Sequence, residues 1–253
     1  ARWFEGALLN YAEHALRRAG EGGDEVAVVG VSQSRERVAL TWHELSDQVA
    51  RARAGLVRLG VEPGDRVAAY LPHIPETVIA FLATASLGAI WTSCAPEFGV
   101  QAVLDRFTQV EPTVLLAVEG YRYGSRFVDR HAELAAISDG LPSVRHTVVV
   151  TYPKRPSSPG VIAWDELISE YMPLAFTHVA PDHPLYVLYS SGTTGLPKPI
   201  VHGHGGILLE HLKVLGLHAD MGPDDRFFWF TTTGWMMWNY LVSGLLVGAR
   251  LVL

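Results

Sequence analysis

The stretch from Leu185 to Gly206, LYVLYSSGTTGLPKPIVHGHGG, determines how the rest of this sequence is interpreted. It starts with a short aliphatic and aromatic run, Leu185 to Tyr189, which follows a proline and precedes a serine, as is typical of a buried strand. A loop rich in serine, glycine and threonine comes next, and then a single lysine, Lys198. This order predicts a strand, a phosphate-binding loop, a cation and the start of a helix.

The loop has the chemistry of a polyphosphate site. Glycine adopts backbone angles that are closed to other residues, so several N–H groups can converge on one anion, and serine and threonine add hydroxyl donors. The lysine supplies a positive charge, and the prolines on either side of it stiffen the segment that carries it. We therefore expect a polyphosphate to be bound by Ser190, Ser191, Gly192, Thr193, Thr194, Gly195 and Lys198.

The spacing differs from that of the Walker loop, in which GxxxxGK is followed by serine or threonine. Here Gly192 is followed by Gly195, and a proline follows Lys198, which disfavours a simple P-loop ATPase. On composition alone, a turn with a solvent-exposed lysine is the alternative. The full string from Tyr189 to Lys198, YSSGTTGLPK, resembles the phosphate-loop signature of the acyl-adenylate-forming enzymes, which include acyl-CoA synthetases, luciferases and the adenylation domains of peptide synthetases. The resemblance implies that this loop binds the phosphates of ATP and that Lys198 is the catalytic cation.

Composition limits the class of protein. The chain has 253 residues, of which 49% are hydrophobic and 18% charged, and its net charge is −6. Such a chain can bury a large core, and without a long basic run it lacks the electrostatic signature of a nucleic-acid-binding protein. No apolar run reaches the length of a membrane span, so we expect a cytoplasmic protein whose partners are small molecules. A single cysteine, Cys94, excludes a disulfide within these residues.

Strand and helix patterns alternate along the chain. A capping-box pattern at Thr41 to Glu44 precedes a helical periodicity that ends at Gly60. The alternation implies parallel pairing, and hence an α/β fold made of layered βαβ units with mostly parallel sheets. We expect strands at 25–31, 37–40, 66–71, 89–93, 113–118, 146–150, 185–189, 227–231 and from 250, and further helices at 1–18, 75–87, 100–110, 127–137, 164–171, 205–217 and 238–246.

A second motif follows the strand expected at 227–231, where Thr231 to Tyr240 reads TTTGWMMWNY. In open α/β sheets ligands bind at the carboxyl ends of strands, although tryptophan and methionine are also common in cores. In acyl-CoA synthetases a Gly-Trp pair in the corresponding stretch lines the pocket for the acyl group and pantetheine. The resemblance therefore assigns four residues to that pocket: Gly234, Trp235, Met236 and Met237.

Two arginines flank Gly124 in the stretch EGYRYGSR, just after an expected strand. Guanidinium groups can bind a phosphate through two parallel hydrogen bonds, and the alternative is a solvated surface charge. Short-chain acyl-CoA synthetases have a similar segment in which two arginines contact the phosphate of CoA. Arg122 aligns with the first of these, and Arg126 is displaced by one position from the second.

His202 and His204 alternate in VHGHGG, but no acidic or cysteine residue lies beside them in the sequence. The spacing alone is a weak indication of metal binding, and polar residues are common where a helix begins. We expect no metal site within this chain.

The resemblance covers nearly the whole chain, and two stretches narrow it within the family. Trp91 to Gly99, WTSCAPEFG, and Thr231 to Tyr240 are similar to acetoacetyl-CoA synthetases. The resemblance implies an AMP-forming ligase, acetoacetate–CoA ligase in the first place. In that reaction the carboxylate attacks the α-phosphate of ATP to give an acyl-adenylate and pyrophosphate, and the thiol of CoA then displaces AMP. Mg²⁺ is required in the first step.

The resemblance also implies that residues 1–253 form a partial N-terminal adenylation domain that carries the phosphate loop. The residues that bind adenine, ribose and magnesium, and a small C-terminal domain with a catalytic lysine, would then lie outside this chain, which by itself would be inactive. Three alternatives stay open: an acetyl- or other short-chain acyl-CoA synthetase, an adenylation domain that feeds a carrier protein, and a non-catalytic nucleotide-binding module.

Overall fold

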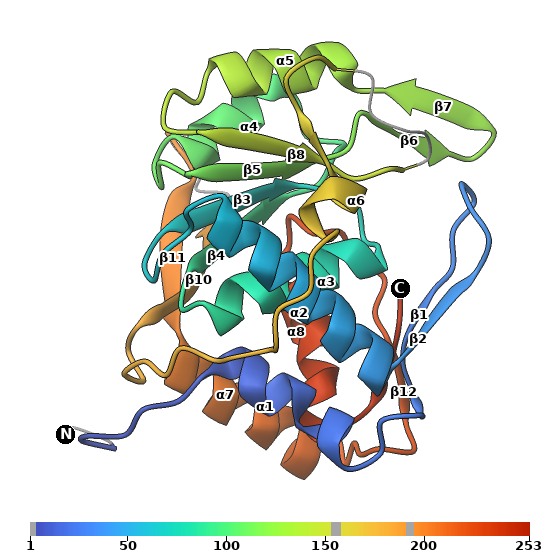
Figure 1. Cartoon of the computed structure of the whole chain (residues 1–253), viewed down its shortest axis with the longest axis vertical. Helices are drawn as coiled ribbons and strands as arrows, with labels where there is room; N and C mark the ends of the chain where they lie inside the picture. Colours follow the sequence, from blue (N-terminus) through green and yellow to red (C-terminus); the bar gives the residue numbers. More distant parts are fainter. Residues whose placement is uncertain (1–3, 153–157, 191–194) are drawn as a thin grey trace.

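The computed structural model describes residues 4–152, 158–190 and 195–253 (Figure 1). Its largest sheet has seven strands in the order β11-β10-β4-β3-β5-β8-β9. All neighbours in it pair in parallel except β10 and β11, which confirms the expected α/β fold. The strands are β3 (Arg66–Tyr70), β4 (Ile90–Cys94), β5 (Val114–Ala117), β8 (His146–Val149), β9 (Ile162–Ala163), β10 (Pro184–Ser190) and β11 (Lys198–Gly203).

A second sheet joins the two ends of the chain, in the order β12-β13-β1-β2. β13 lies between β1 and β12 and is parallel to both, whereas β2 is antiparallel to β1 and forms an edge. The strands expected at 25–31 and 37–40 are therefore confirmed, and they pair as a hairpin. The strands are β1 (Val26–Gly30), β2 (Val38–Thr41), β12 (Arg226–Phe228) and β13 (Arg250–Val252).

Helices cover both faces of the large sheet, with α2 (Trp42–Arg58) and α3 (Pro75–Ser86) on one face and α4 (Val100–Phe107) and α5 (His131–Asp139) on the other (Figure 1). Successive side chains of a strand point to opposite faces, so each strand contributes to two cores. In β3, Val67 belongs to the core that contains α3, and Ala68 belongs to the core that contains Phe107 of α4.

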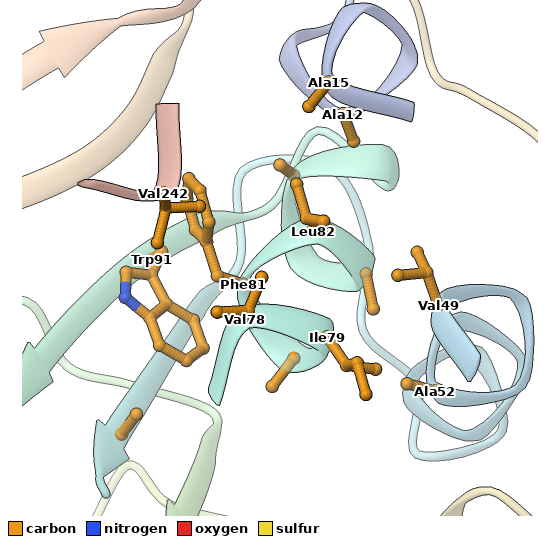
Figure 2. Packing of buried hydrophobic residues seen from close by; sticks show 14 of the residues in the cluster. Ala12, Ala15, Val49, Ala52, Val78, Ile79, Phe81, Leu82, Trp91 and Val242 are labelled. Atoms are coloured by element: carbon orange, nitrogen blue, oxygen red, sulfur yellow. The ribbon is translucent and has the colours of Figure 1, made fainter. Parts of the chain in front are cut away.

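The helix α3 lies at the centre of the larger core. Nearly all of its side chains are buried, and in Figure 2 they point in several directions, toward α1 (Tyr11–Leu16), toward α2 and toward Trp91. The ring of Phe81 has its centroid 5.8 Å from those of both Trp91 and Trp238. Because Trp238 belongs to α8 (Met236–Val242), this packing anchors the helix that follows the Gly-Trp pair.

The helix ends follow local rules. Both hydrogen bonds of the capping box between Thr41 and Glu44 are present at the start of α2. The helix expected at 1–18 starts only at Tyr11, where the side chain of Asn10 accepts a hydrogen bond from the backbone N–H of Ala12, and Leu8 is exposed. The expected helix at 164–171 is a single turn, α6 (Trp164–Leu167). Short helices directly follow α1, α7 (His204–Leu212) and α8. They are η1 (Arg17–Gly20), η2 (Lys213–His218) and η3 (Ser243–Val247).

The helix predicted at 127–137 is partly wrong. Residues 126–129 form β7 (Arg126–Asp129), which pairs with β6 (Gly120–Tyr123) as an antiparallel hairpin. Two residues, Gly124 and Ser125, connect the strands, and Gly124 has a φ of +59°, which glycine adopts without strain. The turn therefore overrides the helical pattern of the residues that follow, and α5 starts only at His131.

The helix expected at 205–217 is confirmed as α7 (His204–Leu212), which η2 continues, but the sequence analysis did not predict that residues 198–203 form the strand β11 before it. β11 is an edge strand, where a proline is tolerated since its missing N–H need not pair. The strand predicted at 227–231 stops at Phe228. None of the helices within the described ranges is long and apolar enough to cross a membrane.

Candidate active site

The carboxyl ends of the parallel strands meet at one edge of the large sheet. From this edge the chain leaves β3 toward α3 on one face, and it leaves β4 toward α4 on the other face. Neighbouring strands whose connections leave toward opposite faces open a crevice between them, which is where ligands bind in open α/β sheets. A ligand-binding site is therefore predicted at the carboxyl ends of β3 and β4.

The segment from Thr231 to Trp235 is fixed across this crevice. The hydroxyl of Thr233 donates to the carbonyl of Leu71, the residue after β3, at 2.6 Å. The hydroxyl of Ser93 in β4 donates to the carbonyl of Thr233 at 2.7 Å. Thr233 is completely buried, so both bonds are shielded from water. The Gly-Trp motif thus lies at the carboxyl ends of β3 and β4, although the strand expected directly before it ends at Phe228 in the other sheet.

A hollow of about 310 Å³ opens beside this segment. Met237 lines the hollow, and Trp235 and Met236 are 59% and 53% exposed. Trp235 and Met236 are therefore not part of the core of this chain, whereas Trp238 of the same motif is fully buried in it. The hollow is lined by Trp229, Phe230, Thr231, Thr232, Trp235 and Met237.

Gly234 permits a close approach of the loop that follows β4. A Cβ atom at this position would lie 2.9 Å from the ring of Phe98, so no other residue fits without a shift of the aromatic ring. The hydroxyl of Tyr70 fixes the same loop by donating to the carbonyls of Pro96 and Phe98, at 2.7 and 2.9 Å. Burial raises the pKa of Tyr70, which keeps this donor protonated.

Lys198 lies next to the last residue of β10. In the antiparallel pairing of β10 and β11, Ser190 is opposite Lys198, so the predicted cation is at the same edge of the sheet as the Gly-Trp motif. Lys198 is exposed, and Gly195 has a φ of +91°, which requires glycine. The predicted phosphate-binding residues Ser191, Gly192, Thr193 and Thr194 lie outside the described residues.

The two arginines predicted to bind the phosphate of CoA lie in the β6–β7 hairpin. Arg122 is opposite Phe127 and Arg126 is opposite Tyr123, so the two guanidinium groups start from opposite faces of the hairpin. Both arginines are exposed. The two arginines belong to neighbouring residue pairs of the hairpin, but their side chains do not start from the same face.

The histidines near the phosphate loop have structural contacts. His204 is fully buried, and its Nδ1 accepts the backbone N–H of Tyr11 at 3.1 Å. Burial lowers the pKa of His204 to about 4, so the ring is neutral near pH 7. Cys94 is buried as well, and burial raises its pKa to about 12. Within the described ranges, no three His, Cys, Asp or Glu side chains come together as a metal site.

The sequence analysis did not identify His73, which follows β3 at the crevice. Burial lowers its pKa to about 4, an effect partly offset by a hydrogen bond with the backbone of Thr231. Its Nε2 atom and the hydroxyl of Thr232 are buried without a hydrogen-bond partner among the described residues. The signal that could have found it is position, because His73 stands between the end of a strand and a proline-initiated helix.

Comparison with known proteins fits this geometry. The sequence profile of the AMP-binding enzymes matches residues 16–253. The chain belongs to the AMP-binding enzyme family. It is 44% identical over 260 residues to the acetoacetyl-coenzyme A synthetase of Rhizobium meliloti and 40% identical over 263 residues to the acetoacetyl-CoA synthetase of Rattus norvegicus. A malonamoyl-CoA synthetase of Penicillium aethiopicum is also 40% identical, over 266 residues.

Among solved structures of AMP-binding enzymes, the acetoacetyl-CoA synthetase from Streptomyces lividans superimposes with a TM-score of 0.96 at 55% sequence identity. The alignment covers 100% of this chain and 39% of that protein. The alignments with the bacterial and rat relatives likewise cover 100% and 99% of this chain, and 39% of each relative. The chain therefore spans about two fifths of the length of these relatives.

Proposed function

We propose that the protein to which these residues belong is an AMP-forming ligase. It would join a short acid, acetoacetate in the first place, to CoA through an acyl-adenylate, with ATP cleaved to AMP and pyrophosphate. One observation carries the proposal. Lys198, in the first position of β11, and the Gly234–Trp235 pair, which directly follows the bridging residue Thr233, occur at the same edge of the large, mostly parallel sheet.

In this proposal the protein acts by position and charge. Lys198 and the hydroxyl and backbone donors from Ser190 to Gly195 would bind the β- and γ-phosphates. They would offset the charge that develops on pyrophosphate as it leaves. No covalent nucleophile on the protein is required. Mg²⁺ would act on the phosphates of ATP, and the described residues contain no cluster of three His, Cys, Asp or Glu side chains that could hold it.

The acyl group would lie against the hollow beside Trp235. Three of its six lining residues are aromatic, and Met237 is the adaptable one, which suits a small acid with little polar surface. The names of the relatives support an acid with a carbonyl group on its β-carbon, because acetoacetate and malonamate share this feature. Arg122 and Arg126 would serve the phosphate of CoA and hence the second step.

The direct test uses the full-length protein and a panel of acetate, butyrate, acetoacetate and malonamate. Acid-dependent exchange of pyrophosphate into ATP, greatest with acetoacetate, followed by formation of the CoA thioester, is the expected result. Exchange without any CoA thioester would indicate an adenylation domain that feeds a carrier protein. Binding of ATP without exchange for any acid would indicate a non-catalytic module. A preference for acetate would assign the protein to the acetyl branch.

The acid pocket is tested by a matched pair of variants, Met237→Ala and Met236→Ala. Met237 lines the hollow and Met236 does not, so Met237→Ala should raise kcat/KM for hexanoate relative to acetoacetate more than Met236→Ala does. One methylene in such a pocket usually changes discrimination by about 1–3 kcal/mol. Equal losses for all acids, together with a large fall of the melting temperature, would instead indicate core packing.

A further inference from the structure

The end of α4 and the turn that follows it contact the phosphate-loop hairpin on both sides of the loop. On β10, the hydroxyl of Tyr189 donates to the backbone carbonyl of Arg106 at 2.9 Å. On the other side of the loop, the side-chain amide of Gln109 donates to the backbone carbonyl of Pro197 at 2.9 Å. One short segment, residues 106–109, therefore connects the end of β10 with the residue that precedes Lys198.

The contact with β10 is fixed by more than one bond. Burial raises the pKa of Tyr189 to about 12, so its hydroxyl remains a donor at all physiological pH values. The guanidinium of Arg106 lies over the rings of Phe98 and Tyr189, 5.1 and 5.9 Å from their centroids. Because the ring of Phe98 also packs against Gly234, the same helix end is connected with the Gly-Trp motif.

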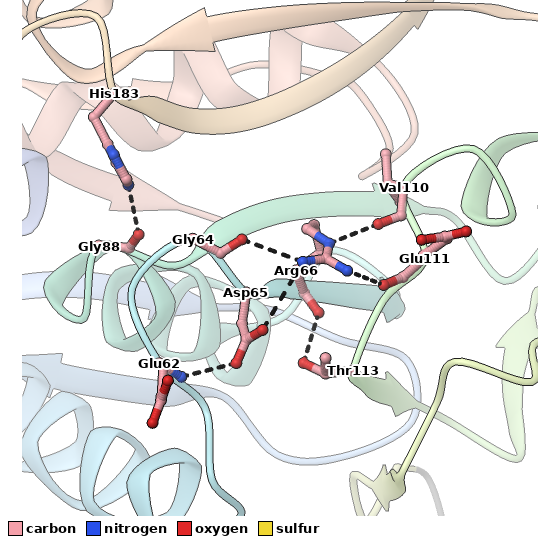
Figure 3. Close-up of polar contacts among 9 residues, drawn as sticks. All are labelled: Glu62, Gly64, Asp65, Arg66, Gly88, Val110, Glu111, Thr113 and His183. Atoms are coloured by element: carbon pink, nitrogen blue, oxygen red, sulfur yellow. Dashed lines mark hydrogen bonds and ion pairs between the residues drawn. The ribbon is translucent and has the colours of Figure 1, made fainter.

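The segment that carries Gln109 is fixed to the sheet. Figure 3 shows Arg66, the first residue of β3, donating to two consecutive carbonyls, those of Val110 and Glu111, both at 2.7 Å. Glu111 has a φ of +48°, a conformation that is uncommon for a residue with a Cβ and that the guanidinium contacts hold in place. The amide of Gln109 also donates to the carbonyl of Asp105 at 2.6 Å, which restricts its side chain.

The hairpin needs such a support beside Lys198. The residue after it, Pro199, is opposite Tyr189 and has no N–H to give to the ladder. β11 has no neighbour on its other side among the described strands. The carbonyl of Pro197 belongs to the same peptide unit as the backbone nitrogen of Lys198, so a hydrogen bond to that carbonyl fixes the plane from which the lysine side chain starts.

We propose that Gln109 is a positioning residue for Lys198: its amide, supported by Arg66 through the adjoining carbonyls, holds the Pro197–Lys198 peptide so that the ammonium group is presented to the phosphates. Gln109 does not touch the substrate in this proposal. The inference rests on the proposed function in one respect, since it assumes that Lys198 binds the phosphates of ATP.

The test compares Gln109→Ala and Gln109→Glu with Gln101→Ala in the full-length protein. Gln101 is a matched control, because it is an exposed glutamine of α4, the helix just before Gln109, and its amide donates to the side chain of Asp105 and not to the hairpin. Loss of one neutral hydrogen bond should slow acid-dependent pyrophosphate exchange by roughly three- to tenfold in both Gln109 variants. Gln101→Ala should match the parent, and all melting temperatures should agree.

The rates of the two half-reactions, measured separately, distinguish a positioning role of Gln109 from a structural one. The conversion of added acyl-adenylate and CoA to the thioester does not use the leaving pyrophosphate, so it should keep its rate in the Gln109 variants. Equal slowing of both half-reactions, or exchange in Gln109→Ala equal to that in Gln101→Ala, would overturn the proposal. Tyr189→Phe, which removes the bond on β10 and keeps the ring, should also slow only the first half-reaction.

Failure of the proposed function has a different result. If the parent exchanges no pyrophosphate with any acid, the ligase proposal fails, and the positioning of Lys198 is measured by ATP protection against an amine-reactive reagent, read at Lys198 by mass spectrometry. Protection should be weaker in Gln109→Ala than in Gln101→Ala. Equal protection in the two variants would overturn the role of Gln109 independently of catalysis.

Discussion

The two hairpins that carry the predicted phosphate-binding residues, β10–β11 and β6–β7, differ in how they are supported. β10 pairs with β4 in the large sheet, and its residues Leu185 to Val187 are buried. β6 and β7 pair only with each other among the described strands, and of β6 only Gly120 is buried. The hairpin that includes a strand of the main sheet thus has its cation next to a buried strand, whereas the hairpin outside the sheet has its two arginines on an exposed ribbon.

The second hairpin is fixed at its base. The backbone N–H of Arg130 donates to the carbonyl of Glu119 at 2.8 Å, and the guanidinium of Arg130 lies 5.6 Å from the ring centroid of Tyr121. Gly120 permits the ring of Phe127 to cross the strand, because a Cβ there would lie 2.5 Å from it. We therefore expect changes in β10–β11 to alter chemistry, and changes at the tip of β6–β7 to alter affinity.

The largest effect should come from Lys198→Ala in the full-length protein. Removal of a charge that stabilises a developing anion typically costs about 3–4 kcal/mol, so acid-dependent pyrophosphate exchange should fall by about a hundredfold or more. The fold should not change, because Lys198 is exposed. An unchanged exchange rate would remove this lysine from the mechanism and abolish the difference between the hairpins.

The next effect concerns pH, because two buried histidines belong to α7, the helix that follows the first hairpin. Burial lowers the pKa of His204 and of His211 to about 4, below the value near 6.5 of an unfolded chain. As pH falls, the unfolded state binds protons before the folded state does. The contribution of the two neutral histidines to the free energy of unfolding is therefore complete above pH 6.5 and is lost as pH falls toward 4. Each histidine should contribute on the order of 2–3 kcal/mol to this loss.

Amide hydrogen exchange, corrected for the effect of pH on the intrinsic exchange rate, measures how strongly acid destabilises each hairpin. Protection of β10 and α7 should fall between pH 6.5 and 4.5 before that of β6–β7. His204→Asn keeps an acceptor for the N–H of Tyr11 and does not titrate, so it should reduce the loss of protection at low pH. The control is His178→Gln, at an exposed histidine, which should not change that loss. The same acid sensitivity in both hairpins would contradict the assignment to these histidines.

A smaller effect is expected from Arg122→Ala and Arg126→Ala, which test the opposite faces of β6–β7. A hydrogen bond to a charged group contributes about 1.5–3 kcal/mol, so the arginine that meets the phosphate of CoA should raise KM for CoA by about tenfold or more when it is removed. Because the two side chains start from opposite faces, we expect a large effect from Arg122 and less than about threefold from Arg126. Pyrophosphate exchange should not change in either variant, and equal effects on KM would show that the hairpin twists enough to direct both to one phosphate.

The smallest effects should come from the two turn glycines. Gly195 and Gly124 have φ values of +91° and +59°, and a Cβ added at either position would meet no atom within 4 Å. Alanine should therefore bring backbone strain of about 1–2 kcal/mol without a clash. Gly195→Ala should slow pyrophosphate exchange, and Gly124→Ala should change only KM for CoA. Melting temperatures separate these local effects from global unfolding.

Much of the fold could be predicted from the sequence where the signal is local. The capping box at Thr41, the proline that opens α3 and the strand at β3 occur where the pattern indicated them. The predictions failed where a turn or an edge decided the outcome. Gly124 and Ser125 convert a helical pattern into β7, and the edge position of β11 accommodates Pro199 in a strand.

The candidate site shows the same division. The sequence alone determined the residue types that can cradle a phosphate around Lys198 and the Gly-Trp pair at Gly234, because these depend on backbone freedom and side-chain chemistry. Only the tertiary structure decided that Thr233 bridges β3 and β4, that Arg122 and Arg126 start from opposite faces, and that Gln109 contacts Pro197. These contacts join residues distant in the chain or depend on strand register, and no periodicity of a single segment encodes them.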